Sequence, residues 1–388
     1  MKIIILEHEP FSERKQKHYF NEDFIKEGFK FEYWDLRSIL SYTRSIQYNY
    51  ELESGVVKKF ASKKEVINEI KRQNSLDVVF IVELGINIET VSYLKIFSKY
   101  NFKWVKMDYY LNPTSSFVLK KSYKDIFLKT NVVKLFKKVC DKIFINILLK
   151  YYRISPEVFF VTGEEEKNVP FETKIISLNY FDVIEWEIEK TKVPLLDYSY
   201  IVFQDIMIVD HPDIKRNGIR GDSLNRRKYF ESLNIFFLRL ESIYGIPVVI
   251  AAHPKSNYSD EFGTRKVYIG QTANLSLNAN LIVTHGSLSI SYALLSYKPI
   301  LLLDVSSLIV NTILKDFFKY NVINLSKNID CCIVDITDND FLFSIDSVSV
   351  NKEKYYEYSR LNLLAKDYGI FSNYVIFKEE IKKLLNNE

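Results

Sequence analysis

The chain has 388 residues, enough for two domains of the usual size of roughly 100–200 residues. Hydrophobic residues make up 47% of it, which excludes wholesale disorder, and a net charge of +4 is too small to indicate a nucleic-acid partner. The three cysteines form neither a disulfide framework nor a zinc motif, so we expect a cytoplasmic protein.

The first half of the chain alternates short apolar runs with stretches of helical period. Strands are expected at residues 2–7, 31–35, 77–83, 102–108, 158–162 and 174–178. Helices are expected at residues 12–26, 62–72 and 131–152, with another ending near residue 100. Because parallel strands need a long crossover between them, this alternation predicts βαβ units and a parallel sheet.

A second alternating series follows a junction near residues 185–198. Its strands are expected at residues 200–204, 248–252, 281–284, 300–304 and 332–335, and its helices at residues 226–244, 289–296 and 306–320. We therefore predict an α/β protein with two doubly wound Rossmann-type domains, residues 1–190 and 191–350, that face each other across a cleft. Two C-terminal helices in residues 351–388 are expected to pack back on the first domain.

The sequence predicts neither a signal peptide nor a transmembrane helix. Only four apolar residues in a row precede Glu7, too few for a signal peptide. No segment offers about 18 or more apolar residues without polar interruptions, so no transmembrane helix is expected.

Ligands of open α/β sheets bind beyond the carboxyl ends of the strands, so the residues that follow each strand are the candidates for a site. After the strand 248–252 come His253, Pro254 and Lys255. An imidazole N–H and an ammonium both donate to oxyanions, and proline fixes the direction of the chain between them. This trio predicts a phosphate-binding turn.

The strand 281–284 leads through a glycine turn into the next expected helix. Thr284, Gly286, Ser287 and Ser289 lie in this turn. Glycine lets the backbone approach a ligand, and serine hydroxyls can either cap the helix or bind phosphate oxygens. About thirty residues, close to one βαβ crossover, separate this turn from His253, so we predict that both turns bind one anion.

In the first domain, Glu83 ends the strand 77–83 and precedes Leu84-Gly85. A carboxylate at a strand end can act as a general base. Asp35 and Asp108 hold similar strand-end positions and are rival candidates.

The His253-Pro254 pair and the later serine-rich turn resemble bacterial sialyltransferases and polysialyltransferases of the GT-B fold. Residues 200–304 as a whole are similar to bacterial glycosyltransferases of capsule, lipopolysaccharide and other surface polysaccharides, notably at Phe203-Gln-Asp205, His211-Pro-Asp213, Phe236-Phe237 and Pro299-Ile300.

The resemblance implies an inverting, metal-independent transfer that needs no cofactor besides the nucleotide-sugar donor. A CMP-linked sialic-acid-like or Kdo-like sugar is the favoured donor, ahead of UDP-sugars and CDP-alcohols, and the acceptor is a surface glycan that can be lipid-linked. By this resemblance His253, Ser287 and Ser289 surround the donor phosphate and Glu83 deprotonates the acceptor. Asp205 would orient a substrate and Asp304 would contact the ribose.

Two other classes stay open. Asp210, His211, Asp213, His253 and His285 could be assembled into the metal site of a hydrolase, although no H-x-H or H-E-x-x-H spacing supports it. A GT-B-like protein without catalysis would bind glycans or act as a scaffold.

The helix expected at residues 131–152 is amphipathic. Apolar residues from Val132 to Leu148 fall on one face, and Lys134, Lys137, Lys138 and Lys142 lie opposite. Such a helix either packs on its domain with the lysines in water or lies on an anionic membrane as a peripheral contact.

Overall fold

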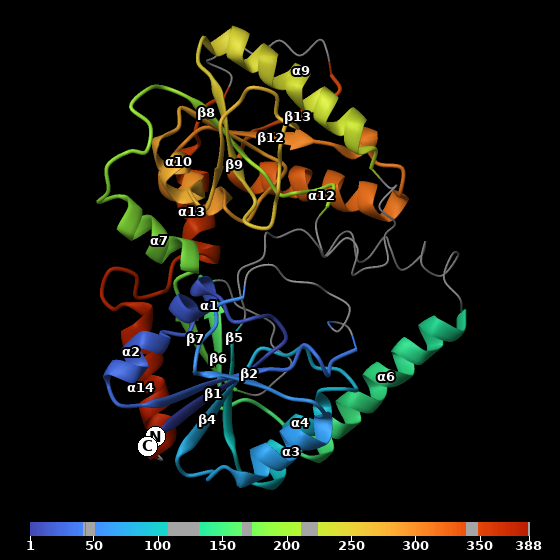
Figure 1. Ribbon diagram of the computed structural model, residues 1–388, viewed down its shortest axis with the longest axis vertical. Coiled ribbons are helices and arrows are strands. Elements are labelled where there is room, and N and C mark those ends of the chain that lie inside the picture. The colour runs from blue at the N-terminus through green and yellow to red at the C-terminus, as the bar shows by residue number, and fades with distance from the viewer. Residues whose placement is uncertain are drawn as a thin grey trace. The chain divides into compact units, whose positions relative to one another are not determined.

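The computed structural model describes residues 1–41, 43, 51–107, 132–164, 173–210, 224–338 and 348–386. Within these residues the chain forms two compact units (Figure 1). Unit 1 contains the described residues of 1–107, 132–178 and 365–386, and unit 2 contains the described residues of 179–364. The division falls after residue 178 rather than at the expected residue 190, and the C-terminal tail is shared between the units.

Unit 1 is built on a seven-stranded sheet of order β3-β2-β1-β4-β5-β6-β7, in which all neighbouring strands are parallel. Its strands are β1 (Lys2–Glu7), β2 (Lys30–Asp35), β3 (Val57–Lys59), β4 (Val78–Val82), β5 (Lys103–Met107), β6 (Val158–Thr162) and β7 (Lys174–Leu178). Its helices are α1 (Glu13–His18), α2 (Asn21–Lys26), α3 (Lys63–Arg72), α4 (Val91–Lys99), α6 (Val132–Tyr151) and α14 (Asn373–Asn386).

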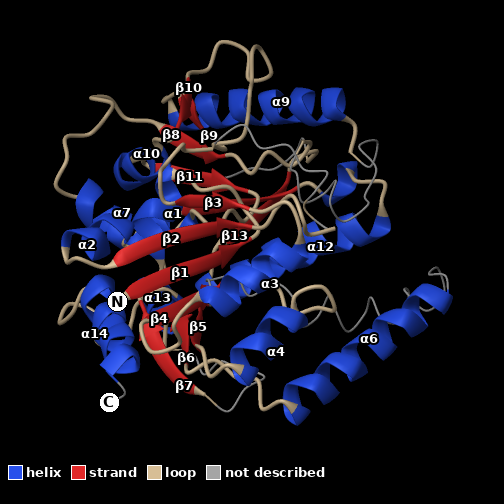
Figure 2. Cartoon of the chain, turned by 60° about the horizontal axis from the view of Figure 1, so that its bottom comes forward, coloured by secondary structure: helices blue, strands red, loops and turns tan. Residues whose placement is uncertain are grey.

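Helices cover both faces of this sheet (Figure 2), and a cluster of hydrophobic side chains lies on each face. Strands β4 and β6 are buried at every position, the pattern of parallel strands enclosed on both sides. One cluster joins the sheet to α2, α14 and the residues that flank α1, and the other joins it to α3, α4 and the end of α6.

The expected helix at residues 12–26 is divided into α1 and α2. Phe20 between them has φ of 53°, a left-handed conformation that ends the first helix. The buried apolar residues Phe11, Tyr19, Phe20 and Phe24 flank α1 or lie in α2, and they belong to one cluster on the same side of the sheet.

Unit 2 is built on a six-stranded parallel sheet of order β10-β9-β8-β11-β12-β13. Its strands are β8 (Ile201–Gln204), β9 (Val248–Ala252), β10 (Val267–Ile269), β11 (Leu281–Thr284), β12 (Ile300–Asp304) and β13 (Cys332–Asp335). Its helices are α7 (Phe181–Glu189), α9 (Arg226–Tyr244), α10 (Thr272–Asn278), α11 (Ile290–Leu295), the 3-10 turn η1 (Ser306–Leu308), α12 (Thr312–Ile329) and α13 (Lys352–Asn362).

Three helical segments differ from the expectation. The junction at 185–198 is partly helical, because α7 occupies its first part. The helix expected at 306–320 begins later, where the Asn311 side chain accepts from the Leu314 N–H and caps α12. Of the two C-terminal helices, α13 packs within unit 2, and only α14 joins unit 1, with Phe377 and Ile381 fully buried.

Each sheet has one point where the strand order reverses direction. In unit 1 it lies between β1 and β4, and in unit 2 between β8 and β11. The loops beyond the carboxyl ends of the strands diverge at such a point and leave room for a ligand. These two switch points are therefore the places to look for a site.

No helix in the described ranges is long and apolar enough to cross a lipid bilayer.

Candidate functional site

The switch point of unit 2 is organised by Asp205, the first residue after β8. Its carboxylate is 6% exposed and accepts hydrogen bonds from the Tyr258 hydroxyl (2.7 Å), the His253 N–H (3.3 Å) and the Met207 N–H (2.8 Å). Burial raises the pKa of Asp205, and these hydrogen bonds oppose the rise in part. Asp205 thus joins the loops after β8 and β9, which makes it a positioning residue.

His253 follows β9 and is half-buried at this edge of the sheet. Its Nδ1 accepts the Lys255 N–H at 3.1 Å, so the neutral ring carries its proton on Nε2. That proton makes the imidazole a hydrogen-bond donor. Pro254 is exposed, and Lys255 is half-buried on the same turn.

The turn after β11 is held by neutral polar groups. Thr284 Oγ1 accepts the Ser287 N–H at 3.1 Å, and Ser287 Oγ accepts the Ser289 N–H at 3.2 Å. The Gln204 side chain donates to the Ser289 carbonyl at 3.0 Å and so connects β8 to this turn. Gly286 has φ of +87°, and a Cβ there would lie 2.8 Å from the Asn321 side-chain nitrogen. The turn thus brings Thr284, Gly286, Ser287 and Ser289 to the same sheet edge as His253.

Two buried amide oxygens adjoin this turn without a hydrogen-bond partner among the described groups. They belong to Gln204 and Asn321, whose side chains are 1% and 6% exposed. A buried acceptor without a donor costs about 1–3 kcal/mol, so the arrangement favours a ligand or water that supplies an N–H or O–H.

The helix that follows the turn is shorter than expected. It spans Ile290–Leu295 rather than 289–296, and the Ser289 side chain makes no capping hydrogen bond. A six-residue helix contributes only a small dipole, so the polar groups of the turn itself are the features that favour an anion.

Three further candidates have structural partners or lie elsewhere. Asp304, at the end of β12, accepts the Ser306 N–H at 2.8 Å and begins the 3-10 turn. Asp35 in unit 1 is held by the Arg37 guanidinium, whose Nε lies 2.9 Å from both carboxylate oxygens. Asp108 lies outside the described residues.

His285 does not support the hydrolase alternative. It is fully buried, with Nε2 at 2.9 Å from the Tyr229 hydroxyl and Nδ1 at 3.1 Å from the Leu303 carbonyl. Burial lowers the pKa of His285 to about 4, against a smaller opposing effect of the Leu303 carbonyl. Both ring nitrogens therefore have protein partners rather than a metal.

The other residues proposed for a hydrolase metal site do not support that site either. Asp210 forms an ion pair with Arg226, while His211 and Asp213 lie outside the described residues. Within the described part of the chain, no group of three or more His, Cys, Asp or Glu side chains is arranged to hold a metal ion.

The switch point of unit 1 contains charged residues. Glu83 follows β4 and is 8% exposed, and its carbonyl oxygen lies 3.2 Å from Nδ1 of His8. His8 follows β1, and the same Nδ1 lies 2.9 Å from the Glu7 carboxylate. Glu7 is 1% exposed and accepts from the Lys15 ammonium (2.6 Å) and the Tyr19 hydroxyl (2.9 Å).

The charges of Glu7, His8 and Lys15 shift one another's pKa values. Burial alone raises the pKa of Glu7, but Lys15 and His8 outweigh it and hold the pKa well below its usual range. Burial lowers the pKa of His8, but the hydrogen bond and charge of Glu7 outweigh that effect and raise it. Burial also lowers the pKa of Lys15, yet Glu7 and Glu9 raise it overall. His8 is thus an imidazole of raised basicity beside Glu83.

The sequence patterns did not lead us to Glu7, His8 or Lys15. The signal was present in Glu7-His8-Glu9 directly after the first strand. The partner Lys15 comes from α1, and its approach to Glu7 follows only from the folded chain.

Comparisons with known proteins agree with this architecture. The sequence matches no protein-family model and none of the curated proteins compared with it. The wall teichoic acid polymerase TagF, in its H444N variant, superposes with a TM-score of 0.52 at 11% identity, covering 100% of this chain and 88% of that one. A UDP-glucosyltransferase from Polygonum tinctorium, capable of glucosylating indoxyl, superposes with a TM-score of 0.50 at 9% identity, covering 100% and 99%.

Identities this low establish the fold alone. The chain has a GT-B-like fold of two Rossmann-type domains. This confirms the predicted fold class, an α/β protein with two doubly wound domains. Neither of these two structures is that of a sialyltransferase, so the expected relation to that family stays a prediction.

Proposed function

We propose that this protein is a glycosyltransferase that uses a nucleotide-sugar donor. The observation that carries the proposal is that each unit of a GT-B-like fold has a switch point, and that the two switch points differ in chemistry. The one in unit 2 gathers His253 and the polar turn around Gly286, and the one in unit 1 gathers Glu7, His8 and Glu83.

The donor is held by unit 2 in this proposal. The Nε2–H of His253, the ammonium of Lys255 and the hydroxyls of Ser287 and Ser289 contact the phosphate. Gln204 Oε1 and Asn321 Oδ1, two acceptors in need of a donor, accept from hydroxyl or N–H groups of the nucleoside. No metal or cofactor takes part, since fixed hydrogen-bond donors stabilise the leaving phosphate.

A UDP-linked sugar is the favoured donor. The likeness of fold to a UDP-glucosyltransferase supports it better than the CMP-linked sugar indicated by the His253-Pro254 resemblance. A CDP-alcohol stays a third donor class, and the likeness of fold to a wall teichoic acid polymerase supports a cell-surface polymer as acceptor.

The chemical step inverts the anomeric carbon. The acceptor oxygen forms a bond to that carbon while the bond from the carbon to the phosphate oxygen breaks, and the nucleotide departs with the bonding electrons. The acceptor proton goes to His8 Nε2 or to the Glu83 carboxylate, and the raised pKa of His8 makes it the stronger base.

A nucleotide screen tests the proposal. Thermal shifts with UDP, CMP and CDP at equal concentration identify the donor class, because a ligand at 100 times its Kd stabilises by about 2.7 kcal/mol. UDP should give the largest shift, and His253→Ala should lower it and abolish transfer. No shift with any nucleotide would exclude the proposal, and a shift without transfer or donor hydrolysis would favour a binding protein.

The acceptor can be lipid-linked if unit 1 rests on a membrane. The structure describes the side chains of α6 from residue 139 onward, and Val139, Ile143, Phe144 and Ile147 there are 49–57% exposed. This exposed apolar face supports a peripheral contact at the inner side of the membrane. Flotation with anionic liposomes should carry the protein at low salt, and Ile143→Ser with Phe144→Ser should abolish it; no flotation of the native protein would exclude the contact.

A further inference from the structure

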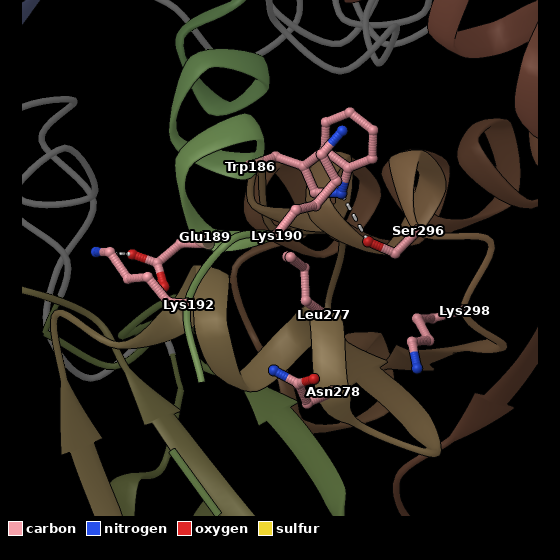
Figure 3. A pocket seen from close by; sticks show the side chains of 8 residues that line it. All are labelled: Trp186, Glu189, Lys190, Lys192, Leu277, Asn278, Ser296 and Lys298. Atoms are coloured by element: carbon pink, nitrogen blue, oxygen red, sulfur yellow. Dashed lines mark hydrogen bonds and ion pairs between the residues drawn. The ribbon is translucent and has the colours of Figure 1, made fainter. Parts of the chain in front are cut away.

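A hollow of about 290 Å³ lies within unit 2, away from the proposed donor site (Figure 3). It is lined by Trp186, Glu189, Lys190, Lys192, Leu277, Asn278, Ser296 and Lys298. Leu277 and Asn278 end α10 just before β11, and Lys298 comes just before β12. The hollow therefore lies at the amino ends of the strands, and His253 and Ser287 follow their carboxyl ends.

One wall of the hollow is the indole of Trp186. Its Nε1 donates to Ser296 Oγ at 2.9 Å, which fixes the ring, and the Lys190 ammonium lies 3.8 Å from the ring centroid (Figure 3). Leu277 adds an apolar side chain, and Asn278 adds an amide. A concave site with an apolar wall and a few polar groups is the usual form of a small-molecule site.

Two of the three lysines that line the hollow form ion pairs with glutamates. Lys192 pairs with Glu189 at 2.6 Å, and Lys190 pairs with Glu187 at 2.7 Å. The half-buried ammonium of Lys298 has neither a hydrogen bond nor an acidic partner among the described residues, and its burial lowers its pKa. Removing a charge from water without a partner is costly, so this ammonium favours an anion beside it.

We propose that this hollow binds a small organic anion, a carboxylate or phosphate group on a body the size of one sugar ring. Lys298 contacts the anionic group, and Trp186, Asn278 and Ser296 contact the body. The volume of about 290 Å³ lies just below the range for small-molecule sites, roughly 300–1,000 Å³, which suits a single ring rather than a dinucleotide.

Trp186 provides a direct reporter. The chain has three Trp residues, and the other two, Trp34 and Trp104, are buried in unit 1 at 0% and 3% exposure. Glucuronate and glucose 1-phosphate should each change the emission of the full-length protein saturably at constant ionic strength, whereas neutral glucose should not. A response to glucuronate alone assigns a carboxylate, and a response to glucose 1-phosphate alone assigns a phosphate. Trp186→Phe should abolish the signal.

Lys298→Gln should weaken binding at least tenfold, while Lys298→Arg, which keeps the cation, should retain it. Lys327→Gln removes one exposed lysine of α12 in the same unit and is the matched control, with unchanged binding expected. His253→Gln should also leave the Trp186 response intact, so a failed donor assay and a failed anion titration are separate results. An absent response to both sugar anions, or an equal response in Lys298→Gln, would overturn the proposal.

Discussion

The switch points of the two units share a topology but differ in chemistry. In unit 1 the residues beside the switch point are Glu7, His8 and Lys15, a buried ionic cluster. In unit 2 the turn after β11 is held by the neutral side chains of Gln204 and Thr284, and the Asp205 carboxylate accepts from a hydroxyl and two backbone N–H groups. The fold provides the location of a site, and the side chains at the strand ends decide what that site can do. The titratable groups of unit 1 are suited to proton transfer, and the neutral polar groups of unit 2 are suited to binding an anion.

The histidines His8 in unit 1 and His285 in unit 2 show the same difference between charged and neutral surroundings. His285 is fully buried and His8 is half-buried, and burial by itself lowers the pKa of each. The Glu7 carboxylate beside His8 reverses that effect, whereas His285 has only a hydroxyl and a carbonyl as partners, and its pKa falls to about 4. His8 is therefore suited to hold a proton, whereas His285 is a neutral part of the core.

The sharpest test of the comparison is His8→Gln. Loss of a general base lowers the rate by about 10²–10⁴-fold, so transfer should fall by that factor while nucleotide affinity in unit 2 is unchanged. In the native protein the rate should also fall as pH drops through the raised pKa of His8, because only the neutral ring accepts a proton. Steady-state rates from pH 5 to 9 measure both effects.

Glu83→Gln separates the two base candidates. If Glu83 takes the proton, this variant loses the rate and His8→Gln keeps most of it. Glu9→Gln is the control on the same loop, because the Glu9 side chain is 32% exposed and pairs with Lys15 at 3.4 Å. A rate unaffected by either test substitution would remove unit 1 from the chemistry.

In unit 2 the largest effect on stability is expected for Gly286→Ala. The new Cβ would meet the Asn321 side chain at 2.8 Å on a backbone with φ of +87°. Left-handed strain and overpacking together should lower the free energy of unfolding by about 2–4 kcal/mol in urea titrations.

Gly245→Ala is the matched control for that substitution. Gly245 has φ of +66°, but no atom lies within 4 Å of the point that an alanine Cβ would occupy, so only the strain of about 1–2 kcal/mol applies. Adding Asn321→Ala to Gly286→Ala should recover part of the loss. Equal costs at the two glycines would show that the close approach to Asn321 is unimportant.

The strands were predictable because most are short apolar runs between polar segments. The exceptions are β3 (Val57–Lys59) and β10 (Val267–Ile269), three-residue edge strands of mixed composition whose extended form depends on pairing with β2 and β9. Likewise, no residue pattern marks the left-handed Phe20 that divides α1 from α2. Contacts distant in sequence decide these features.

The two sites differ in the same way. Proline and glycine mark the turns around His253 and Gly286, so the sequence indicated them. The cluster of Glu7 and His8 was missed, because an acidic residue next to a histidine is common on protein surfaces. Only the burial of Glu7 against Lys15 distinguishes it.

Stability should respond to pH with opposite sign at the two histidines. An unfolded histidine binds its proton near pH 6.5, but buried His285 does so only near pH 4, so unit 2 should lose about 3 kcal/mol as pH falls across this window. The raised pKa of His8 instead gives unit 1 stability that is present below pH 6.5 and lost as pH rises through the folded value. Buried His18 of the same unit acts in the opposite direction, because burial holds its pKa well below the usual range. Hydrogen exchange of peptides from each unit, corrected for the intrinsic rate, measures the slopes in the native protein, in His8→Gln and in His285→Gln. The assignment is contradicted if the two substitutions change the slopes in the same direction.

The smallest effect concerns two serines of one turn. Ser287 Oγ accepts the Ser289 N–H, so Ser287→Ala should cost about 1 kcal/mol of stability, whereas Ser289 makes no side-chain cap and Ser289→Ala should cost less than about 0.5 kcal/mol. Any loss of nucleotide affinity in Ser289→Ala therefore reports contact with the ligand rather than damage to the turn. Calorimetric titration of both variants separates the roles: if Ser289→Ala binds nucleotide like the native protein, Ser289 does not contact the phosphate, and the anion is held by the rest of the turn and by His253.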